Sequence, residues 1–148
     1  MDFRDFIEPA LSLPIAHAWR GHGSTIFLEL GQLKPGRVRR DGSIGNASGE
    51  LTVHLGPNWR IEGKRSIVCG SDDGKHAIEK GLQRLIGSLI VDASTFGRLR
   101  ELELNTTDHT LTTFSLWKGQ PLWDIGHAES GLYMFSKFGK IRFEEPRT

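Results

Sequence analysis

The sequence predicts an α+β domain made mostly of antiparallel β-strands, with one main helix at about residues 73–86 packed on the sheet. Three observations support this fold class. Most of the chain consists of short alternating apolar and polar runs separated by Gly, Pro and Asn turn signals. One stretch has helical periodicity. The length of 148 residues suits one hydrophobic core, so we expect a single domain over residues 1–148.

The helix is predicted from an apolar stripe at helical spacing, formed by Ile78, Gly81, Leu82, Leu85 and Ile86. A hydroxyl or carboxylate side chain among residues 71–73 is expected to accept the free N–H groups of the first turn. Gly87 is placed to end the helix in a left-handed conformation. Because Gly81 lies on the apolar stripe, we expect the helix backbone to approach the sheet closely there.

Short strands are predicted on both sides of this helix, and a helical turn is predicted at residues 3–8. The predicted strands are 15–19, 25–33, 50–55, 59–62 and 66–70 before the helix, and 88–94, 98–105, 110–116, 121–126, 131–136 and 140–144 after it. Residues 34–49 form a Gly-rich stretch with four basic residues, and we expect a long mobile loop there.

The two sides of the helix resemble each other, which suggests an internal repeat of residues 13–70 and 86–144. Phe27-Leu-Glu-Leu30 corresponds to Glu101-Leu-Glu-Leu104, and Trp59-Arg-Ile61 to Trp123-Asp-Ile125. Two related β-meanders would each have one open apolar face, and packing the meanders together would bury both faces. The alternative is that any two meanders share the periodicity of strands.

The matched strands place a group of charged residues on one face. In a strand, Trp59 shares a face with Ile61, and Arg60 shares the opposite face with Glu62. Asp124 is at the position that matches Arg60. Either the tryptophans are core residues, or the opposite face lines a cleft in which Arg60, Glu62 and Asp124 bind a small ligand.

Two residues near the start of the helix are candidates for chemistry. Cys69 ends a strand just before the helix, a setting that favours the thiolate, and His76 follows in the first turn. The alternative is that Cys69 packs in the core. Asp72 and Asp73 together with His76 have the spacing of metal ligands, but helix capping explains both aspartates. We therefore predict no metal site and no cofactor.

Charge and hydropathy limit the partners. The net charge of +1 gives no global field for nucleic acid, and no apolar run is long enough to span a bilayer. The single cysteine and the acidic N-terminus suggest a cytoplasmic protein. The stretch 131–138 has apolar residues on both faces, so it is either a central strand or an edge that pairs with another protein or with a second copy.

Three short motifs carry a resemblance to a known group: the strand Trp59-Arg-Ile-Glu62, the following Cys-Gly-Ser-Asp-Asp turn with its helix, and the strand Trp123-Asp-Ile. With these motifs the chain resembles, over residues 13–136, a group of small uncharacterised bacterial proteins, some relatives of which are toxin-neutralising immunity proteins. The resemblance implies a cytoplasmic protein that binds another protein. The hypotheses are therefore a non-enzymatic protein-binding module, a small-ligand binder, or a hydrolase or transferase that uses Cys69.

Overall fold

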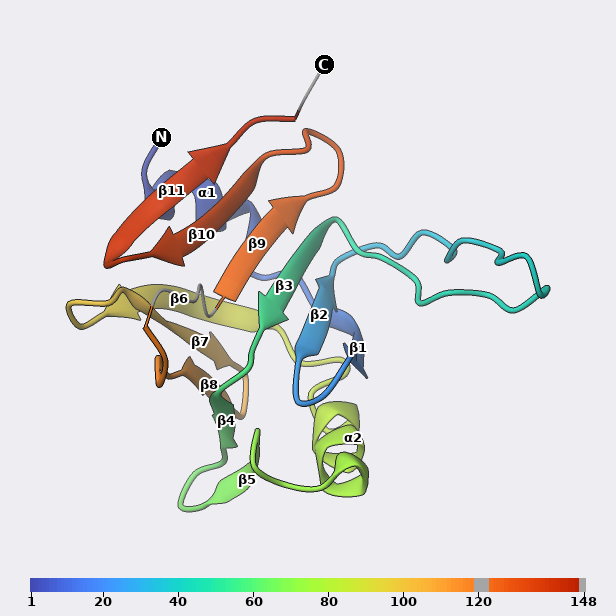
Figure 1. Cartoon of the computed structure of the whole chain (residues 1–148), viewed down its shortest axis with the longest axis horizontal. Helices are drawn as coiled ribbons and strands as arrows, with labels where there is room; N and C mark the ends of the chain where they lie inside the picture. The colour runs from blue at the N-terminus through green and yellow to red at the C-terminus, as the bar shows by residue number, and fades with distance from the viewer. Residues whose placement is uncertain (119–122, 147–148) are drawn as a thin grey trace.

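Strands dominate the chain, as the alternating sequence predicts. The computed structural model describes residues 1–118 and 123–146 and folds them into two antiparallel sheets with two short α-helices (Figure 1). The first sheet has the order β1-β2-β3-β9-β10-β11, and the second has the order β5-β4-β8-β7-β6. All pairs of neighbouring strands are antiparallel. The fold class predicted from the sequence is therefore confirmed at the level of an antiparallel α+β architecture.

The strands follow the predicted runs closely. In chain order they are β1 (Ile15–Arg20), β2 (Ile26–Leu30), β3 (Leu51–Leu55), β4 (Trp59–Glu62), β5 (Ile67–Gly70), β6 (Ile90–Phe96), β7 (Glu101–Thr106), β8 (Thr110–Thr113), β9 (Trp123–His127), β10 (Tyr133–Lys137) and β11 (Lys140–Glu144). The strand predicted at 121–126 is β9, and its first two predicted residues lie outside the described part of the chain.

The prediction of one main helix needs correction. There are two short α-helices, α1 (Phe3–Ile7) and α2 (Lys75–Gln83), and a 3-10 turn at Glu8–Ala10 follows α1. Helix α2 is shorter than the predicted 73–86 at both ends, and its N-cap is Gly74, which offers no side chain to the first turn. The carboxylate of Asp73 accepts instead from the Gly70 N–H, so it stabilises the turn before the helix.

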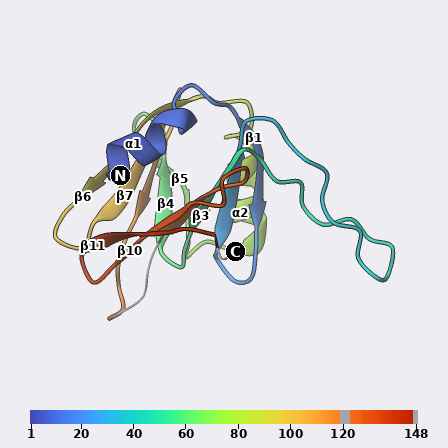
Figure 2. The ribbon, with the colours of Figure 1, turned by 90° about the horizontal axis from the view of Figure 1, so that it is seen from above.

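Residues 32–49, which we call the arm, form a two-stranded ribbon where the sequence predicts a mobile loop. Figures 1 and 2 show it extending away from both sheets. Lys34 and Ser48 exchange backbone hydrogen bonds of 2.7 and 3.1 Å, and Val38 pairs with Ile44 nearer the tip. Cross-strand hydrogen bonds therefore give this Gly-rich segment a defined conformation.

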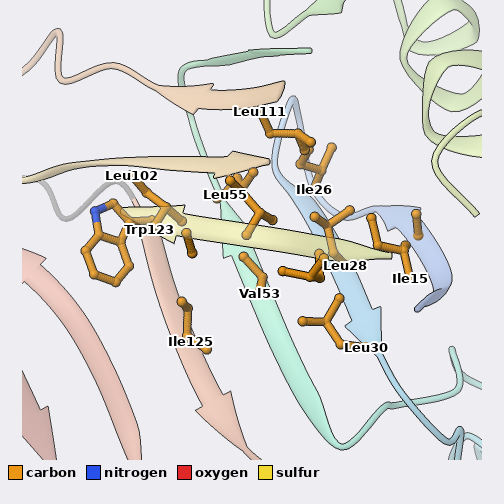
Figure 3. Packing of buried hydrophobic residues seen from close by; sticks show 14 of the residues in the cluster. Ile15, Ile26, Leu28, Leu30, Val53, Leu55, Leu102, Leu111, Trp123 and Ile125 are labelled. Carbon is orange, nitrogen blue, oxygen red and sulfur yellow. The ribbon is translucent and has the colours of Figure 1, made fainter. Parts of the chain in front are cut away.

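The hydrophobic core lies between the two sheets. Leucine, isoleucine and valine side chains of the first sheet meet those of the second, and the indole of Trp123 closes one end of the cluster (Figure 3). Helix α2 adds Ile78 and Leu82 to this core. Two sheets that are each apolar on one face stabilise one another by burying those faces together.

The strand orders of the two sheets correspond. Strands β1-β2-β3-β9-β10 have the same order as β6-β7-β8-β4-β5, so the first five strands and the next five are divided three and two between the sheets in the same way. Strand β11 has no counterpart and extends the first sheet. The indole of Trp59 donates to the Ser24 carbonyl (2.7 Å), and that of Trp123 donates to the Arg100 carbonyl (2.8 Å). Both carbonyls lie in the turn between the first two strands of a half. The duplication itself stays a prediction.

Within residues 1–118 and 123–146, neither helix has the length and apolar character that a lipid bilayer crossing requires.

Candidate functional site

The Cys69 thiol lies in the core and not in a reactive setting. Its side chain is 2% exposed, and burial, followed by the negative charge of Asp73, raises the pKa of the thiol to about 11. His76 is exposed on α2, and no hydrogen bond joins it to Cys69 within the described ranges. Because a thiolate is the reactive form, a thiol with so high a pKa gives the enzyme hypothesis no support.

The three residues predicted for a ligand cleft do not come together. Arg60 donates from Nε to Glu62 Oε1 (2.6 Å) on the outer face of the second sheet, and its guanidinium lies over the Phe114 ring. Asp124 lies on the outer face of the first sheet, where its Oδ2 is 2.6 Å from His54 Nδ1. The core separates these two faces, so they line no common cleft. A ligand role for any one of the three stays a prediction.

Asp124 belongs to a row of side chains that crosses the first sheet. The rings of Trp19 and Phe27 are stacked with centroids 4.1 Å apart, and Phe27 stacks in turn on His54 at 4.6 Å. Tyr133 lies beside Asp124, and partial burial followed by that negative charge raises the pKa of its hydroxyl well above the usual value. Phe27 is therefore stacked between Trp19 and His54 in the middle of this row.

Exposed apolar side chains lie close together at another part of the surface. Three loops meet at the end of the sheets opposite the arm: the β6–β7 turn, the segment after β8 and the β10–β11 turn (Figure 1). The Ser136 hydroxyl on β10 donates to the Leu99 carbonyl (2.9 Å) and so joins the β6–β7 turn to this strand. We call their four exposed apolar residues the end patch: Leu99, Leu116, Trp117 and Phe138.

The end patch surrounds a cavity of about 310 Å³. Trp123, which is buried, forms part of its wall, and Glu101 lines it with a side chain that is also buried. The Glu101 carboxylate accepts from the Ser115 N–H (2.8 Å) and from the Thr113 hydroxyl (3.1 Å). A mostly apolar hollow with one fixed carboxylate is a shape that an apolar side chain of a partner, or a small ligand, can fill.

Basic side chains are grouped around the same loops. They are Arg98, Arg100, Lys118, Lys137 and Lys140. Arg98 and Arg100 are exposed in the β6–β7 turn, and the Lys137 ammonium lies 5.6 Å from the centre of the Phe138 ring. Among the described residues that line the cavity only Glu101 is acidic, and it is buried, so the exposed charge around the end patch is positive. Such a surface is complementary to an acidic one.

Phe138 is held in a conformation that its residue type disfavours. The two-residue turn between β10 and β11 has φ = 51° at Phe138 and φ = 72° at Gly139. Gly139 suits this place, because a Cβ there would lie 2.6 Å from the Arg98 carbonyl oxygen. A bulky residue in the left-handed region costs roughly 1–2 kcal/mol. The Phe138 ring is 69% exposed, so little burial offsets that cost.

Two alternatives were predicted for the stretch 131–138, a central strand or a pairing edge, and the structure shows the central strand. Strand β10 pairs with β9 on one side and with β11 on the other, so it is a central strand and offers no free edge to another chain. Pairing of two copies through this strand is excluded by that arrangement. Its exposed apolar residue is Phe138, which lies in the turn that follows the strand.

Neither metal ligands nor similarity to known proteins points to a function. No group of three or more His, Cys, Asp or Glu side chains that could hold a metal ion is present in the described ranges. The chain matches no protein-family model, no curated protein and no solved structure.

Sequence reasoning missed the end patch, although one signal was visible. Lys137-Phe-Gly-Lys140 is a two-residue hairpin turn in which Phe138 takes the place that Asn or Asp usually fills. Leu116 is the last residue of the strand predicted at 110–116, and Trp117 follows it directly, whereas β8 ends at Thr113. Their exposure depends on where the sheet ends, which the local sequence does not reveal.

Proposed function

We propose that this protein is a non-enzymatic protein-binding module, and that the end patch is its binding surface. The observation that carries the proposal is the exposed Phe138 ring, held in a strained turn beside Trp117 and a cavity. Backbone strain without compensating burial is typical of residues kept for function. Exposed aromatic residues near the centre of a surface, with arginine close by, are typical of protein-binding hot spots.

The positive charge around the end patch indicates the charge of the partner's surface. The basic residues around the end patch favour a partner with an acidic surface, on which an apolar side chain enters the cavity. The resemblance to immunity proteins suggests the class of that partner, a protein toxin. A hollow surface fits a protruding side chain better than it fits the flat surface of a lipid bilayer.

The proposal is tested by affinity capture from the native lysate, followed by native mass spectrometry of the eluted complexes. The test variant is Trp117→Ala with Phe138→Ala. The control variant is Ile67→Ala with Val91→Ala, because these apolar side chains are also exposed but lie away from the end patch. Loss of an aromatic hot-spot residue typically costs binding about 2 kcal/mol or more, roughly thirtyfold in affinity.

We expect the native protein and the control variant to retain one acidic protein in a fixed ratio, and the test variant to lose it. Salt should weaken the complex, because charged groups at the rim are screened. A protein that binds the test variant as well as the native chain would contradict the end patch as the binding surface. Capture of no stoichiometric protein would contradict the proposal as a whole.

A small-ligand binder is the second candidate, and the cavity favours it. Its volume of about 310 Å³ and the buried Glu101 carboxylate suit a small apolar molecule with a hydrogen-bond donor. The same native mass spectra distinguish the two functions, because a bound small molecule adds a small mass to the monomer. Substitution Glu101→Gln should remove such an adduct and leave a protein complex in place.

A further inference from the structure

We propose that the arm is a second docking element for an acidic protein surface, and that the buried Glu29 carboxylate holds it in a fixed direction. The proposal goes beyond the end patch, because Figures 1 and 2 place the arm and the β6–β7 and β10–β11 turns on opposite sides of the molecule. A partner can therefore bind at either surface without the other, and each surface can be tested on its own.

The arm contributes almost nothing to the core. Val38 and Ile44 face each other across the ribbon near its tip, and each is 67% exposed. Arg37, Arg39 and Arg40 are exposed beside this apolar pair. A long ordered ribbon with exposed apolar and arginine side chains is costly in chain entropy and gains little burial. That composition, an apolar centre with arginine around it, is common at protein interfaces.

The charge of the chain is unevenly divided. Four of the 19 basic residues but one of the 18 acidic residues lie on the arm, so the arm carries a formal charge of +3. The other 15 basic and 17 acidic residues give the rest of the chain a charge of −2. The arm is thus a small positively charged segment on a mildly negative protein. A compact acidic surface on a partner is complementary to it.

A nucleic acid is a poorer fit to the same arm. No aromatic residue lies between 32 and 49, so the arm cannot stack on bases. A duplex extends far beyond the length of the arm and would meet the acidic remainder of the chain. An acidic protein surface avoids both problems. It needs no stacking, and its negative charge does not extend beyond the arm to the acidic remainder of the chain.

The root of the arm is fixed by a buried carboxylate. Glu29 is 2% exposed, and three groups from different segments donate to it. They are the indole N–H of Trp19 on β1 (2.8 Å), the hydroxyl of Thr52 on β3, and the backbone N–H of Gly49 at the end of the arm (3.2 Å). A buried charge with several donors is held tightly, because leaving any donor unpaired is costly.

A second carboxylate supports the other strand of the root. Glu50 accepts the backbone N–H of Gln32 at 2.8 Å, so the first and the last residues of the arm are both tied to acidic side chains. Farther out, the ring of His17 on β1 contacts Asn46 of the arm (Nε2 to Oδ1, 3.0 Å). A docking element that is ordered before binding loses less entropy when its partner arrives.

Binding is tested with a fluorescent dye on Ser43→Cys, which reports contacts at the tip of the arm. The buried Cys69 thiol, with its pKa of about 11, stays unlabelled near neutral pH. The probes are poly-L-glutamate and duplex DNA at equal phosphate or carboxylate concentration. The test variant is Arg37→Gln/Arg39→Gln/Arg40→Gln, and the control Lys64→Gln/Arg65→Gln/Lys75→Gln removes three exposed cations elsewhere.

We expect the test variant to bind poly-L-glutamate about tenfold more weakly and the control variant to bind it nearly as well as the native arm. The end-patch variant Trp117→Ala/Phe138→Ala should also leave this affinity unchanged. An equal loss in the control variant would overturn the proposal, because net charge alone would then explain binding. If duplex DNA bound the arm more tightly than poly-L-glutamate does, and lost this binding in the test variant, the choice of a protein partner would be overturned.

The positioning role of Glu29 is tested on the protein alone. Spin labels on Ser43→Cys and Ala77→Cys measure the distance from the arm tip to α2. With Glu29 native we expect one narrow distance distribution. In Glu29→Gln the amide N–H₂ faces the Trp19 or Gly49 donor, so the distribution should broaden while the circular dichroism of the sheets is kept. A distribution that stays equally narrow in the folded variant would overturn this role.

Discussion

Phe138 is the residue that most clearly departs from what its local sequence favours. The turn between β10 and β11 places two successive residues in the left-handed region, which Asn-Gly satisfies with the least strain. Phenylalanine has neither the small size nor the local hydrogen bonding that makes asparagine tolerant of this region. The exposed ring is therefore explained by binding better than by folding.

This argument predicts opposite effects of one substitution on stability and on binding. Phe138→Asn should raise the free energy of unfolding by about 1 kcal/mol, because the turn strain is relieved. The same variant should weaken the complex formed through the end patch. Urea unfolding followed by circular dichroism measures the first effect. A lower free energy of unfolding in Phe138→Asn would show that the ring stabilises the fold.

The sequence predicts correctly which single residues are buried, but it does not predict which distant residues form pairs. Trp59 and Trp123 are buried with partners for their indole N–H groups, as the core interpretation expects. The pairing of Asp124 with His54 joins residues 70 positions apart. Such a pair depends on which strands become neighbours, and strand periodicity alone does not determine that.

Among the elements, α2 shows how the sheet determines the extent of a helix. The apolar stripe predicts a helix to residue 86, yet Ile86 is partly exposed and the helix ends at Gln83. The close approach expected at Gly81 is present: an added Cβ would lie 2.4 Å from the Cys69 sulfur. The stripe therefore predicts the contact correctly and the boundary less well.

This contact predicts an unusual response to a helix-favouring substitution. Gly81→Ala should gain about 1 kcal/mol in helix propensity but lose roughly 1–3 kcal/mol by crowding Cys69, so the variant should be less stable. In a Cys69→Ala background the sulfur is gone, and the same substitution should become neutral or stabilising. A double-mutant cycle by urea unfolding measures this coupling. Equal effects of Gly81→Ala in both backgrounds would contradict the packing.

The arm is the element that composition describes least well. Its glycines and basic residues predict a mobile loop, but cross-strand hydrogen bonds and the Glu29 carboxylate order it. In the sequence Glu29 is the polar member of an alternating strand, a pattern that does not predict a buried carboxylate. Its burial follows from Trp19 and Thr52 on the two neighbouring strands, which become its neighbours only when the sheet has formed.

For the whole molecule, the matching strand orders make the two halves depend on each other. Each half gives strands to both sheets, so neither half has a closed core without the other. The two tryptophans occupy corresponding places in this arrangement, and each indole N–H joins the start of one strand to a turn of the other sheet. The sequence comparison of the halves predicts this correspondence, whereas the exchange of strands between sheets is visible only in the structure.

Because each half of the chain gives strands to both sheets, we expect Trp59 and Trp123 to stabilise the same core by similar amounts. Trp59→Phe and Trp123→Phe each leave one carbonyl without its donor and a small void, and each should lower the free energy of unfolding by about 1–3 kcal/mol. The exposed Trp117→Phe is the matched control and should change it little. Urea unfolding followed by circular dichroism should show a single transition in every variant. Two separate transitions in either core variant would mean that the halves unfold independently, which one core made from strands of both halves does not allow.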